Sequence, residues 1–188
     1  MSQFKSVRHL VLAALFVALG VVLQIYSIKT PIARIGLSPI PIMLSGLFLG
    51  PVTGGIVGLA KDLIGVLIDG NAPFPWITLV QIMYGVLPAL FLRPLLKVFQ
   101  GKFQAAAYFL GIALIQLING TFLNTAALTL LLDGQITMPF FLARLGMRLP
   151  GQVIHIILYP VVTYVLVMAL AKALQHDQTG VPLLRTSK

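Results

Sequence analysis

Apolar residues fill most of this chain in long runs, which short polar or proline-containing segments separate. A helix needs roughly 20 predominantly apolar residues to cross a hydrocarbon core of about 30 Å, and several runs approach that length. The pattern predicts a single membrane domain, residues 1–188, that contains six membrane-spanning helices. Their approximate spans are 10–27, 36–49, 51–69, 77–96, 104–132 and 150–171. The expected fold class is therefore an all-α integral membrane protein.

The predicted spans differ in regularity. Residues 39–50 are too few for a straight crossing, so we expect the second helix to begin earlier, to tilt or to be broken. Gly50-Pro51 is a turn signal, and Pro51 suits the first position of the third helix. Gly54, Gly55 and Gly58 are expected to form a close-packing face of that helix. The fourth helix is expected to bend near Pro88. Residues 137–149 are predicted as a separate amphipathic segment before the sixth helix.

Composition agrees with a membrane protein and excludes several other classes. Mean hydropathy is +1.01 and only 9% of the residues are charged, which is far from a soluble domain. Cysteine is absent, so disulfides and thiolate metal sites are excluded. No basic stretch is dense enough, or interleaved with aromatic residues, for nucleic-acid binding. The first apolar run lacks a convincing small-residue cleavage site, so we expect it to remain as a helix.

The lysine and arginine residues predict the orientation in the membrane. With six spans both termini lie on one side, and Lys61 lies within the membrane. The side of the termini carries Lys5, Arg8, Arg93, Lys97, Lys102, Lys172, Arg185 and Lys188, and the other side carries Lys29, Arg34, Arg144 and Arg148. The chain is predicted to cross the plasma membrane several times. Because the cytoplasmic side of a membrane protein is usually the more basic one, both termini are predicted to lie in the cytoplasm.

Polar residues within the predicted spans collect toward the outer side, while the inner halves of the last three helices are almost purely apolar. Polar groups in lipid are costly unless the bundle satisfies them, so this clustering predicts an outward-facing ligand pocket. Its candidate residues are Arg34, Ser38, Asp62, Trp76, Gln81, Tyr84, Asn119, Asn124, Arg148 and His155. Trp76 and Tyr84 suit stacking on a ring, and the two arginines suit an anionic group.

Each of these residues also has a structural alternative. Trp76 fits an interfacial aromatic belt, and Asn119 and Asn124 fit hydrogen bonding between helices. Arg148, like its neighbour Arg144, fits a side chain that reaches the outer headgroups. His155 fits a hydrogen-bonded interior histidine.

Lys61 and Asp62 are two adjacent charges within an apolar run. Neighbours on a helix project about 100° apart, so these two side chains need not pair with each other. Asp62 is expected to face the bundle. Lys61 is expected to reach an interface or a partner protein.

Several motifs resemble those of the substrate-binding S component of energy-coupling-factor (ECF) vitamin transporters. They are Ala14-xxx-Ala18, Arg34-Ile35-Gly36, Gly50-Pro51-x-x-Gly54-Gly55-x-x-Gly58-x-x-x-Asp62-x-x-Gly65, Phe74-Pro75-Trp76-Ile77-Thr78-Leu79 and Arg148-Leu149-Pro150. The resemblance implies a six-helix bundle that binds a water-soluble vitamin near the extracellular side, with the loop after the first helix covering the ligand. It also implies that the protein topples in the membrane to deliver the vitamin.

The same resemblance implies partners. Ala14 and Ala18 would dock on a transmembrane coupling subunit, which two cytosolic ATPase subunits drive. Small residues one turn apart let helices approach closely, although internal packing is an alternative use of this pair. The sequence has no GxxxxGK[ST] loop, so ATP would be used by the partners, and no cofactor is expected in this chain.

The likeness is greatest to the folate branch, with pantothenate-type members similar. That branch often carries Gly-Phe after Arg-Ile-Gly and a Phe-Pro-Gly-Phe-Thr segment, whereas this chain has Leu37-Ser38-Pro39 and Phe74-Pro75-Trp76-Ile77-Thr78. Folate or pantothenate is therefore the favoured ligand, and pyridoxine or hydroxymethylpyrimidine is the alternative.

Two other functional classes fit the sequence less well. An enzyme would need clustered carboxylates or histidines, but glutamate is absent, the aspartates are scattered, and His9, His155 and His176 lie far apart in the chain. No metal site is expected for the same reason. An autonomous secondary transporter often shows an internal inverted repeat, and no repeat is visible.

Overall fold

The computed structural model describes residues 7–29, 34–99 and 103–174. The helices and strands are α1 (Val7–Ile25), β1 (Ile28–Lys29), β2 (Arg34–Ile35), α2 (Pro39–Leu49), α3 (Pro51–Ile68), α4 (Pro75–Leu87), η1 (Pro88–Leu92), α5 (Arg93–Val98), α6 (Gln104–Ile115), η3 (Gln116–Leu123), α7 (Asn124–Asp133) and α8 (Met138–Leu174). Here η marks a π-helical segment, and α4–η1–α5 and α6–η3–α7 each run on as one interrupted helix. The described chain therefore forms six helical columns, as the hydrophobic pattern predicts.

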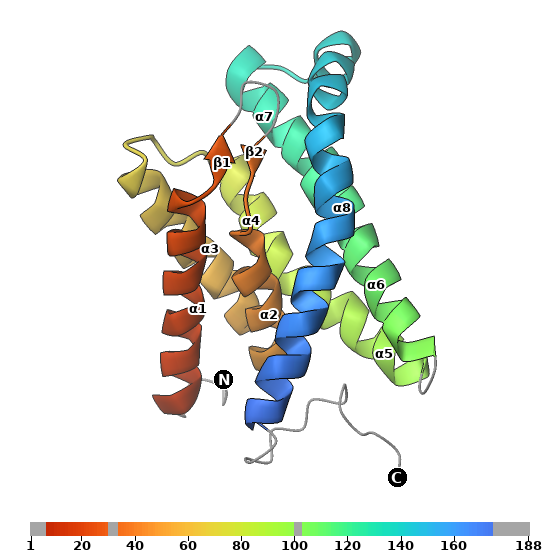
Figure 1. Ribbon diagram of the computed structural model, residues 1–188. Helices are drawn as coiled ribbons and strands as arrows, with labels where there is room; N and C mark the ends of the chain where they lie inside the picture. Colours follow the sequence, from red (N-terminus) through yellow and green to blue (C-terminus); the bar gives the residue numbers. More distant parts are fainter. Residues whose placement is uncertain (1–6, 30–33, 100–102, 175–188) are drawn as a thin grey trace.

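The helices stand side by side, and their connections collect at two ends of the bundle (Figure 1). We call the end where α1 begins and α8 finishes the terminal end. The opposite end, which we call the loop end, carries the β1–β2 pair, the connection from α3 to α4 and the connection from α7 to α8. The start of α1 and the finish of α8 thus share one end, as an even number of crossings requires.

Four columns are long and apolar enough to cross a membrane by length and composition: Pro51–Ile68, Pro75–Val98, Gln104–Asp133 and Met138–Leu170. Two described helices, His9–Ile25 and Pro39–Leu49, are apolar but shorter. The brevity of α2 agrees with the prediction that the second span cannot cross as a straight helix. Nearly all of α2 is buried, so it is a central element of the bundle rather than an outer one.

The prediction of residues 137–149 as a separate segment before the sixth helix is wrong. The helix α8 starts at Met138 and continues to Leu174, with Pro150 and Pro160 inside it. A proline inside a helix leaves one backbone carbonyl without its usual partner, but helices of membrane proteins tolerate this because neighbouring helices satisfy the freed group.

The β1–β2 pair is a small departure from a purely helical chain. The strands have two residues each and pair antiparallel, with Ile28 opposite Ile35 and Lys29 opposite Arg34. A two-stranded pair of this size is marginal by itself. Contacts with the rest of the chain must therefore stabilise the β1–β2 pair.

Close packing of α2, α3 and α4 depends on glycines. A Cβ atom at Gly46 or at Gly54 would collide with the backbone of Gly85, and one at Gly58 would collide with the backbone of Gln81. Small residues at these crossings let the helix backbones approach each other closely. This geometry confirms the predicted packing face at Gly54 and Gly58, whereas a Cβ at Gly55 would meet only side chains of α4.

The π-helical segment η1 replaces the simple bend predicted near Pro88. It runs from Pro88 to Leu92 and leads into α5. Arg93, at the start of α5, donates through Nε to the carbonyl of Leu47 at 2.9 Å and so ties this column to the last turn of α2. A cation there also suits the negative end of the α2 dipole.

Candidate functional site

A layer of polar side chains crosses the interior of the bundle from α4 through η3 to α8. Tyr84 Oη donates to Gln116 Oε1 at 2.9 Å, and Gln116 Nε2 donates to Gln152 Oε1 at 3.0 Å. All three side chains are buried. We call these residues, together with Asn119 and His155, the polar layer. It joins three helical columns that are far apart in the sequence.

Asn119 lies on the π-helical segment η3, which sequence patterns do not reveal. Its side chain is fully buried and donates through Nδ2 to the carbonyl of Val80 at 3.0 Å. π-Helical segments often occur at functional sites, because the extra residue in the turn re-aims neighbouring side chains. The segment places Gln116 and Asn119 beside α4, where they contact Tyr84 and Val80.

Three buried polar atoms in this region have no hydrogen-bond partner. They are Gln81 Oε1 on α4, Asn119 Oδ1 on η3 and His155 Nε2 on α8. Leaving a buried polar group unpaired costs about 1–3 kcal/mol, so each needs an explanation. Three unpaired groups from three elements in one region fit a site that a polar ligand completes.

The two arginines of α8 that the sequence places near this site differ in their surroundings. Arg144 forms a two-pronged pair with Asp133, through Nε to Oδ2 and Nη2 to Oδ1, both at 2.9 Å. Arg148, one turn further on, makes only a long contact of 3.4 Å from Nη1 to the hydroxyl of Thr125. Among the residues that the structure describes, no carboxylate pairs with Arg148. Of these two arginines, Arg148 is therefore the one whose charge no described carboxylate neutralises.

Other candidate residues have structural partners instead. Ser38 donates its hydroxyl to the carbonyl of Gly20 at 2.9 Å, which ties the start of α2 to α1. Asp62 accepts a hydrogen bond of 2.6 Å from the hydroxyl of Thr78, which ties α3 to α4. These bonds explain the burial of both side chains without a ligand.

Trp76 lies apart from the polar layer. Its side chain is 53% exposed at the start of α4, whereas Tyr84 is 3% exposed. Eight residues separate them, or about 12 Å along a helix, which is too far for both to stack on one small ring. The two side chains therefore do not stack together on one small ring, and stacking by either one alone stays a prediction. Trp76 fits the alternative of an interfacial residue.

Asn124 and Arg34 are the remaining candidates. Asn124 begins α7 and is half-buried. Arg34 pairs with Lys29 through the backbone of the β1–β2 pair, and its side chain lies outside the described part of the structure. Its role in binding an anion stays a prediction.

Asp62 faces the bundle as predicted, but the expectation for Lys61 is wrong. Lys61 is only 3% exposed, so it does not reach outward to an interface or a partner. Its side chain packs on Gly20 of α1, where an added Cβ would lie 2.9 Å from Lys61 Cγ. The helix α1 thus covers this charge.

Ala14 and Ala18 lie on the side of α1 that faces away from the bundle, and both are exposed. The helix packs inward through a different set, which includes Ala13, Phe16, Gly20 and Val21. Internal packing is therefore not the use of this pair in the isolated chain.

Sequence reasoning missed Tyr159, which lies one turn after His155 on α8. The two rings pack with centroids 4.9 Å apart, and Tyr159 Oη donates to the carbonyl of Gly36 at 2.6 Å. A tyrosine in an apolar helix carries no distinctive signal. The spacing of Gln152, His155 and Tyr159, three and then four residues apart, places them on one helix face and was the available clue.

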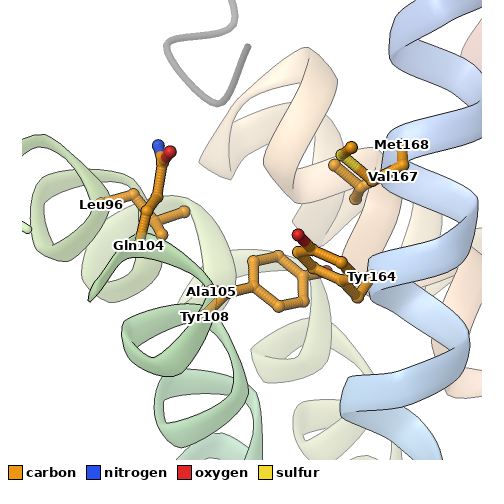
Figure 2. A pocket seen from close by; sticks show the side chains of 7 residues that line it. All are labelled: Leu96, Gln104, Ala105, Tyr108, Tyr164, Val167 and Met168. Atoms are coloured by element: carbon orange, nitrogen blue, oxygen red, sulfur yellow. The ribbon is translucent and has the colours of Figure 1, made fainter. Parts of the chain in front are cut away.

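Figure 2 shows a pocket that none of the polar-layer residues lines. It lies between the α5–α6 corner and α8 and is lined by Leu96, Gln104, Ala105, Tyr108, Tyr164, Val167 and Met168. Its walls are mainly aliphatic and aromatic, without a charged side chain. It does not coincide with the predicted ligand site.

Within the described residues, no three histidine, cysteine or acidic side chains are placed to hold a metal ion. The helical columns and the buried polar layer define a multi-pass membrane protein with a polar site inside its bundle. The chain belongs to the family of substrate-specific components of ECF transporters, whose family model matches residues 8–167. This confirms the resemblance drawn from the sequence motifs. It also makes the chain a subunit of a transporter rather than an enzyme.

Individual relatives agree with this assignment. The chain is 31% identical over 143 residues to the folate transporter FolT of Clostridium novyi (strain NT), a match that covers 75% of this chain and 79% of that protein. The structure is similar to a crystal structure of FolT bound with folic acid, with a TM-score of 0.65, 21% identity, and coverage of 85% of this chain and 92% of the other. It is also similar to the S component of a bacterial ECF transporter, with a TM-score of 0.66, 21% identity, and coverage of 89% and 98%. These structural matches confirm the fold.

Proposed function

We propose that this chain binds folate with high affinity and is the S component of an ATP-driven ECF transporter for folate uptake. The support is the family membership together with the identity to a protein named as a folate transporter. Folate combines a flat ring rich in N–H donors with glutamate carboxylates. A ligand of this kind matches a site that holds both unpaired polar atoms and an arginine.

The observation that carries the choice of an anionic, ring-bearing ligand is the environment of Arg148. Its guanidinium lies on the same helix as His155, and no described carboxylate neutralises it. Gln81 Oε1 and Asn119 Oδ1 are buried acceptors that need donors. A ring with N–H groups and a carboxylate tail supplies both requirements at once.

Binding by the purified chain tests this proposal. Titration calorimetry should show folate binding by the wild-type chain, and pantothenate, pyridoxine and hydroxymethylpyrimidine should compete weakly or not at all. Arg148→Ala should weaken folate binding by about 10-fold or more, because a charge-assisted hydrogen bond is lost. Arg144→Ala is the matched control, since Asp133 already neutralises that charge, and it should change the affinity by less than about 3-fold. Equal effects of the two variants would contradict the assignment of Arg148, and tight binding of another vitamin in place of folate would contradict the proposed ligand.

The proposal extends to partners and orientation. A transmembrane coupling subunit and two cytosolic ATPase subunits would drive transport, and the exposed Ala14 and Ala18 face of α1 would contact the coupling subunit. Both termini would lie in the cytoplasm. The shared end of α1 and α8 supports termini on one side of the membrane, and the excess of lysine and arginine on that side supports the cytoplasm. The ligand site would then open from the outside.

A further inference from the structure

Tyr159 connects the centre of α8 with the segment between β2 and α2. Its hydroxyl donates to the carbonyl of Gly36 at 2.6 Å, across 123 residues of sequence. The side chain is 2% exposed, so water does not compete for this bond. Gly36 follows β2 directly, and residues 36–38 lead from the β1–β2 pair down into α2 beside α8 (Figure 1).

This segment adjoins the polar layer. The helix α2 is short and starts well below the loop end, so residues 36–38 descend into the bundle instead of lying over it. On α8 the face that reaches this segment is the face of Gln152 and His155, because Tyr159 follows them at helical spacing. The polar layer and the segment are therefore neighbours, and Tyr159 lies where they meet.

Two side-chain hydrogen bonds hold the described residues 36–38, besides the packing of Leu37 on the hydrophobic core. The β1–β2 pair contributes only two residues per strand. Ser38 fixes the start of α2 to Gly20 of α1, so the lower end of the segment is held on the α1 side. Tyr159 holds its upper end on the α8 side. Removing the tyrosine hydroxyl would release one side of this support while leaving the helices in place.

We propose that Tyr159 is a positioning residue that holds residues 36–38 against α8 and thereby slows the release of the bound ligand. Its ring packs on His155, whose buried Nε2 has no hydrogen-bond partner, while its hydroxyl binds the carbonyl of Gly36. One side chain thus joins the polar layer to residues 36–38. We call the contact by which Tyr159 holds residues 36–38 against α8 the tether. The claim that the tether slows ligand release rests on the proposed function, whereas the tether itself does not.

Two measurements on Tyr159→Phe test this proposal. The chain contains no cysteine, so Leu37→Cys introduces a unique, half-buried thiol in the segment. In that background, Tyr159→Phe should speed labelling of the ligand-free protein by a maleimide about 3- to 10-fold, the range expected from the loss of one neutral hydrogen bond. Stopped-flow measurement should show a similar rise in the folate dissociation rate, with a smaller change in the association rate. The thermal unfolding midpoint of the ligand-free protein should change little.

Tyr164→Phe is the matched control. Tyr164 lies on the same helix but contacts Tyr108 and Phe109 instead of the segment, so neither rate should change. An unchanged labelling rate in Tyr159→Phe would overturn the tether, and faster labelling with an unchanged dissociation rate would overturn its role in ligand release. Failure of the wild-type chain to bind folate would instead contradict the proposed function, and labelling would then decide on the tether by itself.

Discussion

Tyr84 Oη donates a hydrogen bond of 2.9 Å to Gln116 Oε1 and thereby links α4 to the π-helical segment η3. Gly120 makes this possible, because a Cβ atom there would collide with both the tyrosine hydroxyl and the glutamine amide. Gln116 in turn donates a hydrogen bond to Gln152 on α8. One chain of hydrogen bonds thus links three columns at the site.

Tyr84→Phe tests whether this chain of bonds arranges the site. The variant removes the hydroxyl donor and leaves Gln116 Oε1 without that partner, so we expect folate affinity to fall about 3- to 10-fold. Titration calorimetry measures the affinity, and a thermal scan of the ligand-free protein separates arrangement from stability. Unchanged affinity would mean that the Gln116–Gln152 bond alone positions the site.

Thr78→Val tests the tie between α3 and α4. Thr78 donates its hydroxyl to the buried carboxylate of Asp62 at 2.6 Å, so loss of this bond should destabilise the protein by about 1–3 kcal/mol. Thr129→Val is the control, because Thr129 donates only to the carbonyl of Thr125 one turn earlier in its own helix. Equal unfolding midpoints for the two variants would show that other groups satisfy Asp62.

Gly85→Ala tests the close packing of α2, α3 and α4. An added Cβ would collide with the backbone of Gly54, so the helices must separate and the variant should be strongly destabilised, by about 3 kcal/mol or more. Gly146→Ala is the matched control, since nothing lies within 4 Å of a Cβ at that position. It should be neutral or slightly stabilising, because alanine favours a helix over glycine. Unfolding in detergent compares the two, and similar midpoints would contradict the packing argument.

Replacement of the exposed alanines of α1 tests partner docking. Ala14→Trp or Ala18→Trp should abolish folate uptake in cells that contain the coupling subunit and ATPases, because bulk on this face prevents close helix approach. Folate binding by the purified variants should remain, since both side chains point away from the bundle. Leu15→Trp, at an exposed position of the same helix outside the alanine pair, is the control. Full uptake with both alanines replaced would place the docking surface elsewhere.

Hydrophobic length, glycine spacing and charge are local properties of the chain, and for that reason the sequence by itself predicted the helical columns, the packing face of α3 and the polar character of the site. The same local logic failed at α8, where Pro150 looked like a helix start although a membrane helix can continue through it. It also failed at Lys61, whose burial depends on Gly20 of a different helix.

The tertiary structure decided which polar residues meet. Arg144 and Arg148 look equivalent in sequence, but among the described residues only Arg144 pairs with a carboxylate, because the α7–α8 corner brings Asp133 beside it. Tyr159 donates to the carbonyl of Gly36, which is 123 residues away, and no local pattern predicts that contact. Periodicity assigns a side chain to a face, whereas hydrogen bonds and ion pairs depend on the distance between two faces, which only the packed bundle determines.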